Sequence, residues 1–465
     1  MNRRGAIAAL AVGTAAVAVL GTTVAADGSP GRGDTEREIE QALHDHHPRN
    51  VILLIGDGMG TQEITAARYY QGVHNKLNVD RMPLTGFDTT WSVKPAPKAP
   101  YLPDYDPDSA STGTMWATGV KTLDERISQG PSSAINVPGR NYQSVMEKAR
   151  KRGMKVGDVS TAELTDATPA VQGAHISLRG CQGPTDTAAS CPQETKAAGG
   201  LGSIAEQEVD NHFDVLLGGG RARFEQTVTG GRDKGATVVD SARRQGYQYV
   251  TDANGLRGAK DDRPVLGLFN SGNMSLEWTG PTASTGKGNT PAACTENQRP
   301  ANEPSLADMT SKAIRLLDNR KGFFLQVEGA SIDKQDHATN ACGQLGETVA
   351  FDRAIGVALD YQRTHPDTLV IATADHSHTS QIVSEDAGGT GLPTGYSTNV
   401  VTKDGQTLTL TYGTAGYGGP GAAPSANPPS QQHTGATVPL WGIGPGAAAI
   451  LGTNDHTDLF HTLGG

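Results

Sequence analysis

Short apolar runs recur along the chain, and the clearest are followed at once by glycine or acidic residues. Three of them are Val51–Ile55, Phe323–Val327 and Thr368–Ala374. A run of this length, bounded by polar residues, is typical of a strand buried on both faces of a sheet. We expect shorter strands over residues 155–160 and 438–443.

Segments with helical periodicity alternate with these strands. They cover residues 61–72, 305–319 and 346–363, and Ser305 is placed to cap the second of them. Residues 201–224 indicate a further helix followed by a strand and a glycine turn. Because strands that alternate with helices favour parallel pairing, the sequence predicts an α/β fold. We expect a large, mainly parallel central sheet with helices on both faces.

Composition divides the chain into a tail, a core and an insertion. Residues 27–48 are charged and are predicted to be a mobile N-terminal segment, with a short helix over 36–46. Residues 381–432 are rich in glycine, proline, serine and threonine, which predicts a surface insertion with a small hairpin near 397–412. No internal repeat or linker divides the rest, so we expect one catalytic domain over residues 49–465.

The N-terminus has the pattern of an export signal. Arg3 and Arg4 precede an apolar run from Ala6 to about Val24, and small residues follow up to Ala26. This pattern predicts a signal peptide over residues 1–26 and a secreted, extracellular protein. A membrane anchor is the weaker alternative, because the run is rich in alanine and glycine rather than leucine and isoleucine. The arginine pair leaves the general and the twin-arginine export routes both open.

Charge and cysteine content narrow the class of protein. The chain has 39 Lys+Arg against 49 Asp+Glu, a formal net charge of −10, which argues against nucleic-acid binding. An anionic substrate would also be disfavoured unless a bound metal reverses the local charge. Four cysteines in an exported chain predict two disulfides. Neighbours in sequence favour Cys181–Cys191 and Cys294–Cys342, although three pairings are formally possible.

Acidic and imidazole groups follow the ends of three predicted strands and the end of the insertion. They are Asp57, Glu328, Asp333, His337, Asp375, His376 and His433. In an open α/β sheet, ligands bind beyond the carboxyl ends of the strands, where such groups would meet. Oxygen and imidazole ligands without thiolate suit Zn²⁺ or Mg²⁺. The alternative is a set of surface turns with ordinary solvated charges.

A second candidate site begins at Asp108-Ser109, where a run of small residues predicts the start of a helix. A helix N-terminus offers free N–H groups to an incoming phosphate, although simple capping would give the same pattern. The loop Gly56–Gly60 (GDGMG) has neither a Walker lysine nor a later acidic ribose partner, so dinucleotide binding is not expected.

Six sequence motifs, taken together and in order, resemble one known family. They are GDGMG, DSAS, STAELTDATPA, VEGASIDKQDHA, TADHSHTSQIV and QQHTGA, within about residues 50 to 460. The chain resembles the secreted bacterial alkaline phosphatases, metal-dependent phosphomonoesterases of the alkaline phosphatase–sulfatase superfamily. The resemblance implies the three-layer sandwich of that family and agrees with the neighbouring disulfide pairing. It also implies hydrolysis of phosphate monoesters to an alcohol and inorganic phosphate, in the service of extracellular phosphate scavenging.

Carried over to matching positions, the resemblance makes Ser109 the nucleophile, which would form a covalent phosphoserine. Arg179 would hold the non-bridging phosphate oxygens and would be oriented by Asp108, and Lys334 would reach the phosphate through water. The resemblance also implies two Zn²⁺ and one Mg²⁺. The implied ligands are Asp333, His337 and His433 for one zinc; Asp57, Asp375 and His376, close to Ser109, for the other; and Asp57, Thr168 and Glu328 for magnesium, with Asp166 holding its waters.

Two further residues have open roles. His378 lies two positions beyond His376, so it would orient a ligating carboxylate or be an ordinary buried polar side chain. Asp106, followed by Pro107, stands where the family usually has valine or isoleucine, which puts in question the backbone leading into Ser109.

Three other functions compete with phosphomonoester hydrolysis. A phosphodiesterase of the same superfamily is the main alternative, because the insertion could admit a diester. A sulfatase is weakened by the lack of a Cys-x-Pro-x-Arg motif, and a catalytically silent phosphate-binding protein has little support. The partners that we expect are small phosphate monoesters, with no nucleic acid and no membrane after signal cleavage. The resemblance also allows a homodimer.

Overall fold

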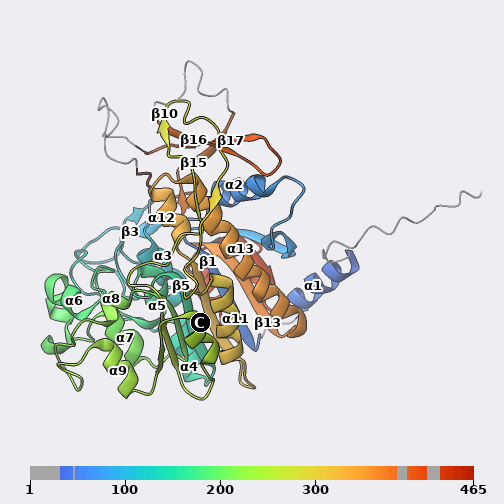
Figure 1. The fold of residues 1–465 in the computed structure, drawn as a ribbon. Coiled ribbons are helices and arrows are strands. Elements are labelled where there is room, and N and C mark those ends of the chain that lie inside the picture. Colours follow the sequence, from blue (N-terminus) through green and yellow to red (C-terminus); the bar gives the residue numbers. More distant parts are fainter. Residues whose placement is uncertain (1–31, 45–47, 385–394, 416–429) are drawn as a thin grey trace, which may run out of the picture.

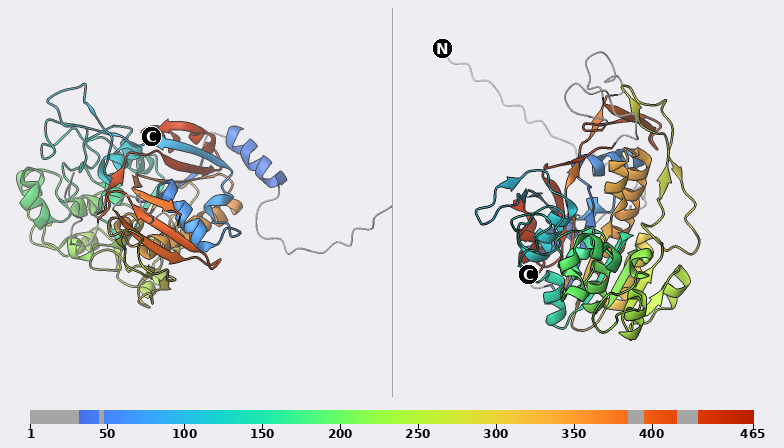
Figure 2. Two further views of the ribbon diagram at one scale, coloured as in Figure 1. Left: turned by 90° about the horizontal axis from the view of Figure 1, so that it is seen from above. Right: turned by 90° about the vertical axis from the view of Figure 1, so that its left-hand side faces the viewer.

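The computed structural model describes residues 32–44, 48–384, 395–415 and 430–465. Its centre is a ten-stranded sheet, which Figures 1 and 2 show from three sides. In spatial order the strands are β20 (Gly452–Asp455), β2 (Leu84–Thr89), β19 (Val438–Ile443), β13 (Thr368–Ala374), β1 (Asn50–Gly56), β12 (Phe323–Gly329), β5 (Lys155–Glu163), β6 (Val215–Gly219), β8 (Val265–Leu268) and β7 (Gln248–Val250). Of these ten, β19 alone runs antiparallel to its neighbours, so the predicted mainly parallel sheet is confirmed.

The sheet is apolar on both faces because helices cover both. Along β1, Leu53 and Ile55 face one core cluster, and Ile52 and Leu54 face the other. Alternate residues of a strand point to opposite faces, so a strand covered on both sides must be apolar throughout. The helices of the first face are α3 (Ser109–Thr118), α4 (Val145–Lys151), α5 (Ala167–Gly173), α7 (Ile204–Asp210), α9 (Val238–Arg244) and α14 (Asp458–Thr462). Those of the second are α2 (Thr61–Gln71), α10 (Ala253–Gly258), α11 (Leu306–Leu317), α12 (Ser331–His337) and α13 (Ala341–Thr364).

The predicted helices are present, with shifted ends. Ser305 caps α11 with a reciprocal capping box, as the sequence indicated. Helix α13 begins at Ala341, ahead of the predicted position 346, because the Asn340 side chain accepts a hydrogen bond from the backbone of Gly343 and caps the helix there. Near the N-terminus, α1 (Arg32–His44) buries Ala42. The mobility of residues 27–48 stays a prediction, and the predicted signal peptide lies outside the described residues.

The insertion belongs to a small second sheet above the end of the main one (Figure 1). Its order is β10 (Ser284–Thr285), β16 (Tyr396–Val401), β17 (Thr407–Tyr412) and β15 (Ser380–Val383). The predicted hairpin is β16–β17, whereas β10 comes from a distant segment that the sequence did not reveal. Beside this sheet, β14 (Ser377–His378) pairs with β18 (His433–Thr434), with His378 opposite His433.

The remaining elements are short and lie at the periphery. They are β3 (Ser92–Val93), β4 (Pro103–Asp104), α6 (Pro184–Ser190), α8 (Arg221–Phe224), β9 (Trp278–Thr279), β11 (Thr295–Glu296) and short 3-10 helices. Within the described ranges, none of the helices has the length and apolar character needed to cross a lipid bilayer.

Both predicted disulfides are present, Cys181–Cys191 and Cys294–Cys342. The second spans 48 residues, so its loss frees a long loop in the unfolded chain. By the chain-entropy relation this should lower the free energy of unfolding by about 4 kcal/mol. We expect that loss in the Cys294→Ala, Cys342→Ala double variant, measured by urea denaturation of the metal-loaded protein. The single Cys294→Ala variant should lose a similar amount, since either change breaks the link. A loss below about 1 kcal/mol in both would contradict this stabilising role.

Candidate active site

The predicted ligand-bearing segments meet at the carboxyl edge of the main sheet. The strands β13, β1 and β12 are neighbours there, with Gly56 level with Ala374 on one side and with Gly329 on the other. Each strand therefore ends at the same height. Asp57, Asp375 and the segment from Glu328 into α12 follow directly, which explains how residues more than 300 positions apart come together.

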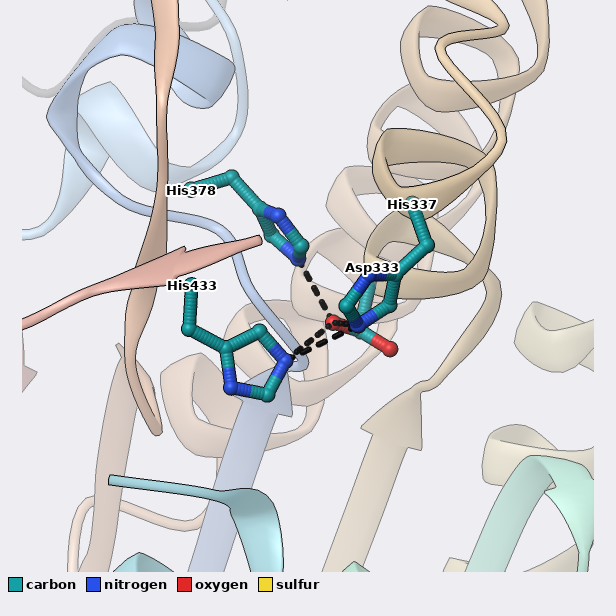
Figure 3. Close-up of side chains that lie close together, drawn as sticks. All are labelled: Asp333, His337, His378 and His433. Atoms are coloured by element: carbon teal, nitrogen blue, oxygen red, sulfur yellow. Dashed lines mark hydrogen bonds and ion pairs between the residues drawn. The ribbon is translucent and has the colours of Figure 1, made fainter. Parts of the chain in front are cut away.

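One cluster gathers three imidazoles around a single carboxylate (Figure 3). Asp333 Oδ1 lies 2.6 Å from His378 Nε2, 3.3 Å from His337 Nε2 and 3.3 Å from His433 Nε2. Asp333 and His337 share one face of α12, as their spacing predicted. His433 reaches them through the pairing of β18 with β14.

The imidazoles of His337 and His433 face each other within this cluster. Their Nε2 atoms are 2.9 Å apart, while His337 Nδ1 lies 2.7 Å from the Gln431 carbonyl and His433 Nδ1 lies 3.1 Å from the Pro107 carbonyl. A carbonyl oxygen can only accept, so each Nδ1 carries a proton and each Nε2 faces the Asp333 carboxylate and the other ring. Two imidazole nitrogens and a carboxylate oxygen that converge in this way can bind one cation. The donor set fits a zinc ion.

A second cluster comprises Asp57, Asp375 and His376, next to Ser109. Ser109 Oγ lies 3.1 Å from His376 Nε2 and 3.4 Å from Asp57 Oδ1. The backbone N–H groups of Gly58 and His376 each donate to Asp375 Oδ1 at 2.9 Å. The other oxygen, Asp375 Oδ2, is buried without a hydrogen-bond partner. This orphaned oxygen faces the cluster, so a divalent cation fits here too.

The pKa shifts of the two carboxyls in this cluster also favour a bound cation. Burial, and then the charges of Asp333 and Asp375, raise the pKa of Asp57 well above its ordinary value. Burial likewise raises the pKa of Asp375. Buried carboxylates in such proximity take up protons unless positive charge is supplied. A bound metal would supply it and keep these groups ionised.

The residues assigned to magnesium are arranged differently. Glu328 accepts a hydrogen bond from Ser160 Oγ, and burial raises the Glu328 pKa to about 7, with the charge of Lys334 opposing that rise. Thr168, in α5, has a buried hydroxyl without a hydrogen-bond partner, which suits a metal ligand. Asp166 instead caps α5 and forms ion pairs with two cationic side chains.

Those cationic side chains are Arg179 and Lys334, and Arg179 also contacts Asp108, the residue before the nucleophile candidate. Arg179 Nη2 is 2.8 Å from Asp166 Oδ1, Arg179 Nη1 is 3.2 Å from Asp108 Oδ2, and Lys334 Nζ is 2.7 Å from Asp166 Oδ2. Burial alone would raise the pKa of Asp166, but the charges of Lys334 and Arg179 outweigh it and hold that pKa below its usual range. The site thus presents two positive charges that share one carboxylate.

Ser109 is the first residue of α3, as its sequence context indicated. Asp108 is the N-cap and accepts a hydrogen bond from the Ser111 N–H at 2.9 Å, so it both ends the loop and contacts Arg179. The unusual Asp106-Pro107 pair leaves this start intact. Pro107 contributes its carbonyl to His433, a role that needs no particular side chain.

The sequence did not identify several contacts that support the site. Asp124 Oδ1 accepts hydrogen bonds from the Ser92 and Ser111 hydroxyls, each at 2.8 Å, and Glu125 contacts both Asp108 and Arg179 through its backbone. The adjacent acidic residues Asp124 and Glu125, in the loop that follows α3, were the signal from which the sequence could have indicated these contacts. A further contact, the Gln431 carbonyl, could not be anticipated because a backbone oxygen has no sequence signature.

Comparisons with known proteins converge on one family. A model of the alkaline phosphatase family matches residues 48–418. The chain is 44% identical over 440 residues to the alkaline phosphatase of Escherichia coli K12, across 93% of this chain and 88% of that protein. It is 47% identical over 426 residues to streptomycin-6-phosphate phosphatase of Streptomyces griseus, across 89% of each.

Solved structures agree on the fold. Thermus thermophilus alkaline phosphatase covers 94% of both chains with a TM-score of 0.64 at 19% identity. Alkaline phosphatase from the Antarctic bacterium TAB5 covers 90% of this chain and 98% of its own with a TM-score of 0.62 at 22% identity. At these sequence identities the structural similarity shows the fold alone.

Proposed function

The chain belongs to the alkaline phosphatase family and is a phosphatase of phosphate monoesters, and from this premise we propose that it acts through a phosphoserine at Ser109. The observation that carries the proposal is the position of the Ser109 hydroxyl. It lies 3.1 Å from His376 and 3.4 Å from Asp57, at the N-terminus of a buried helix. Arg179, which contacts Asp108 next to Ser109, and Lys334 share the Asp166 carboxylate, and together they would neutralise a phosphate dianion.

Two Zn²⁺ and one Mg²⁺ would complete this site. Asp333, His337 and His433 would hold one zinc, and Asp57, Asp375 and His376 the other. Asp57, Thr168 and Glu328 would hold the magnesium, with Asp166 acting through its waters. When bound, these ions would supply the positive charge that favours the ionised forms of Ser109 and of the leaving alcohol. His378, 2.6 Å from Asp333, would orient that carboxylate.

The chain's own groups account for the two transfers. In the first, Ser109 Oγ loses its proton and bonds to phosphorus, the ester P–O bond breaks, and the departing alkoxide takes a proton from water. In the second, water bonds to phosphorus and loses a proton, the Ser109 P–O bond breaks, and Ser109 recovers its proton. Arg179 would donate two N–H groups to the non-bridging oxygens, and Lys334 would reach them through water. Asp108 would keep the Arg179 guanidinium in place.

Trapping tests the covalent step directly. Enzyme mixed with ³²P-labelled inorganic phosphate and quenched in acid should retain label on the Ser109 peptide.

Metal analysis of protein purified without added metal should find two zinc and one magnesium per chain. Zinc or cobalt in the third position, with no Mg²⁺, would argue against the magnesium assignment.

Replacement of Arg179 by lysine should lower kcat/KM for a phosphate monoester by roughly 10- to 100-fold. A lysine keeps the charge but loses the planar pair of N–H donors, and a charge-assisted hydrogen bond contributes about 1.5–3 kcal/mol. Steady-state kinetics with p-nitrophenyl phosphate would measure this effect. Arg221→Lys, on the exposed end of α8, is the matched control and should change kcat/KM little. Equal rates for the Arg179→Lys protein and the wild type would remove Arg179 from the phosphate site.

A phosphodiesterase is the alternative activity. Rates on p-nitrophenyl phosphate and bis-p-nitrophenyl phosphate, measured on one metal-replete sample, would decide between them. We expect the monoester to be hydrolysed faster, because a diester presents one charge fewer to Arg179 and Lys334. We also infer export from the N-terminal pattern, and extracellular phosphate scavenging from the family to which the chain belongs. N-terminal sequencing of the protein recovered from culture medium should begin near Asp27.

A further inference from the structure

Glu125 lies beside the proposed phosphate-binding arginine but has no part in the mechanism above. Its backbone N–H donates to Asp108 Oδ2 at 3.0 Å, and its carbonyl accepts the backbone N–H of Arg179 at 2.6 Å. The same Asp108 oxygen is 3.2 Å from Arg179 Nη1. Glu125 is therefore fixed, through its main chain, to both members of the ion pair that would bind phosphate.

The backbone conformation of Glu125 is unusual. Its φ is 68°, in the left-handed region that glycine adopts readily and that costs other residues about 1 kcal/mol or more. A glycine would form the same two main-chain hydrogen bonds without this strain. The presence of a glutamate here points to a role for its side chain, because the turn itself does not require one.

The Glu125 carboxylate carries charge close to the site without a dedicated partner. The side chain is half-buried, and no group in the described part of the chain donates a hydrogen bond to the carboxylate. Burial, and then the charge of Asp108, raise the pKa of this carboxyl, and the charge of Arg179 opposes that rise. Arg179 already pairs with Asp108 and Asp166, and Glu125, held to Arg179 and Asp108 by its main chain, adds a further acidic residue next to that ion pair.

We propose that Glu125 weakens the affinity of the site for phosphate dianions by electrostatic repulsion, and so limits how tightly the product phosphate is held. Glu125 touches no reacting atom and is not a catalytic residue. The inference rests on the proposed function, since it takes Arg179 as the phosphate-binding group. A surface charge with no influence on the site is the alternative. The main-chain contacts of Glu125 to Asp108 and Arg179 favour the first, because two charges interact appreciably when they share a partially buried environment.

Calorimetric titration with inorganic phosphate tests the proposal on the zinc- and magnesium-loaded protein. The Glu125→Gln variant keeps the size of the side chain and removes its charge. We expect its Kd for phosphate to fall roughly three- to tenfold, and the difference to shrink when the salt concentration is raised. Asp261→Asn is the control, because it removes one exposed charge ahead of β8, at the opposite end of the sheet. Its Kd should equal that of the wild type.

A third variant separates charge from backbone strain. Glu125→Gly removes both, so it should bind phosphate about as tightly as Glu125→Gln if charge is the cause. Tighter binding in the glycine variant alone, or an unchanged or higher Kd in Glu125→Gln, would overturn the proposal. Turnover of p-nitrophenyl phosphate by the wild type is measured alongside. If the wild type does not hydrolyse p-nitrophenyl phosphate, but Glu125→Gln binds phosphate more tightly than the wild type, the proposed function is refuted and this inference stands.

Discussion

Replacing Ser109 with alanine should lower kcat for p-nitrophenyl phosphate by roughly 10³- to 10⁵-fold, the scale expected when a covalent nucleophile is removed from an otherwise intact site. The residual rate would come from water attack on a phosphate still held by Arg179 and Lys334. The loss should appear in kcat rather than in KM, because the groups that bind the ground-state phosphate remain. Steady-state kinetics on metal-loaded protein would measure both.

A control on the same helix makes the result specific. Thr118 is the last residue of α3, and its hydroxyl donates to the Thr114 carbonyl within the helix. Thr118→Ser should keep kcat close to that of the wild type. Acid-quenched labelling should detect phosphoserine in the wild type and in Thr118→Ser, and none in Ser109→Ala. If Ser109→Ala hydrolyses the monoester within tenfold of the wild type, the covalent route is wrong.

Removal of the metal ions should abolish activity, with a loss of at least about 10³-fold, and should also destabilise the fold. The activity falls because the site loses the charge that favours ionised Ser109. The fold weakens because the second cluster buries Asp57 and Asp375 beside the buried ring of His376, and burial raises the pKa of both carboxyls when no metal charge is present. Chelation followed by readdition of Zn²⁺ and Mg²⁺, monitored by turnover and by thermal unfolding, would measure both effects.

The stability of the metal-free protein should depend on pH. Burial alone would lower the pKa of His433, but the hydrogen bond and charge of Asp333 outweigh it and raise that pKa to about 9. A group whose pKa is raised by folding adds stability below its unfolded pKa, and that stability is lost as the pH rises through the folded value. Between about pH 6.5 and 9 the metal-free protein should therefore lose roughly 3 kcal/mol from this group.

The other titrating groups do not reverse this trend. Burial lowers the pKa of His376 and of His378, so their contribution changes below pH 6.5 rather than above it. Burial raises the pKa of Asp57, which works in the same direction as His433. The metal-loaded protein, in which the imidazoles are neutral ligands, should show no such loss over this range. A metal-free protein that gains stability from pH 6.5 to 9 would contradict the prediction.

Local sequence was sufficient for the elements that carry the site. The apolar runs that became β1, β12 and β13 fill both faces of the sheet, and burial on both sides leaves a signal within each run itself. The start of α3 at Ser109 and the shared face of Asp333 and His337 also follow from short-range rules of capping and periodicity. The disulfide pairing followed from neighbours in sequence and from the family resemblance.

Long-range pairing was not visible in the same way. The strands β2 and β20 are short and half-exposed, so their residues carry no clear pattern, and β10 joins the small sheet from more than 100 residues away. The exact sheet order could not be deduced, because parallel strands with similar apolar runs are interchangeable until their connections are packed.

Residue types and their order along the chain therefore determined which chemistry this protein can perform: a serine at a helix start, with carboxylates and imidazoles after strand ends. Tertiary structure alone decided that His433 lies opposite His378, that Arg179 and Lys334 share Asp166, and that backbone carbonyls turn two imidazoles inward. The physical reason is that hydrophobic periodicity and capping act over a few residues, whereas these contacts depend on where distant segments are brought by packing of the whole sheet.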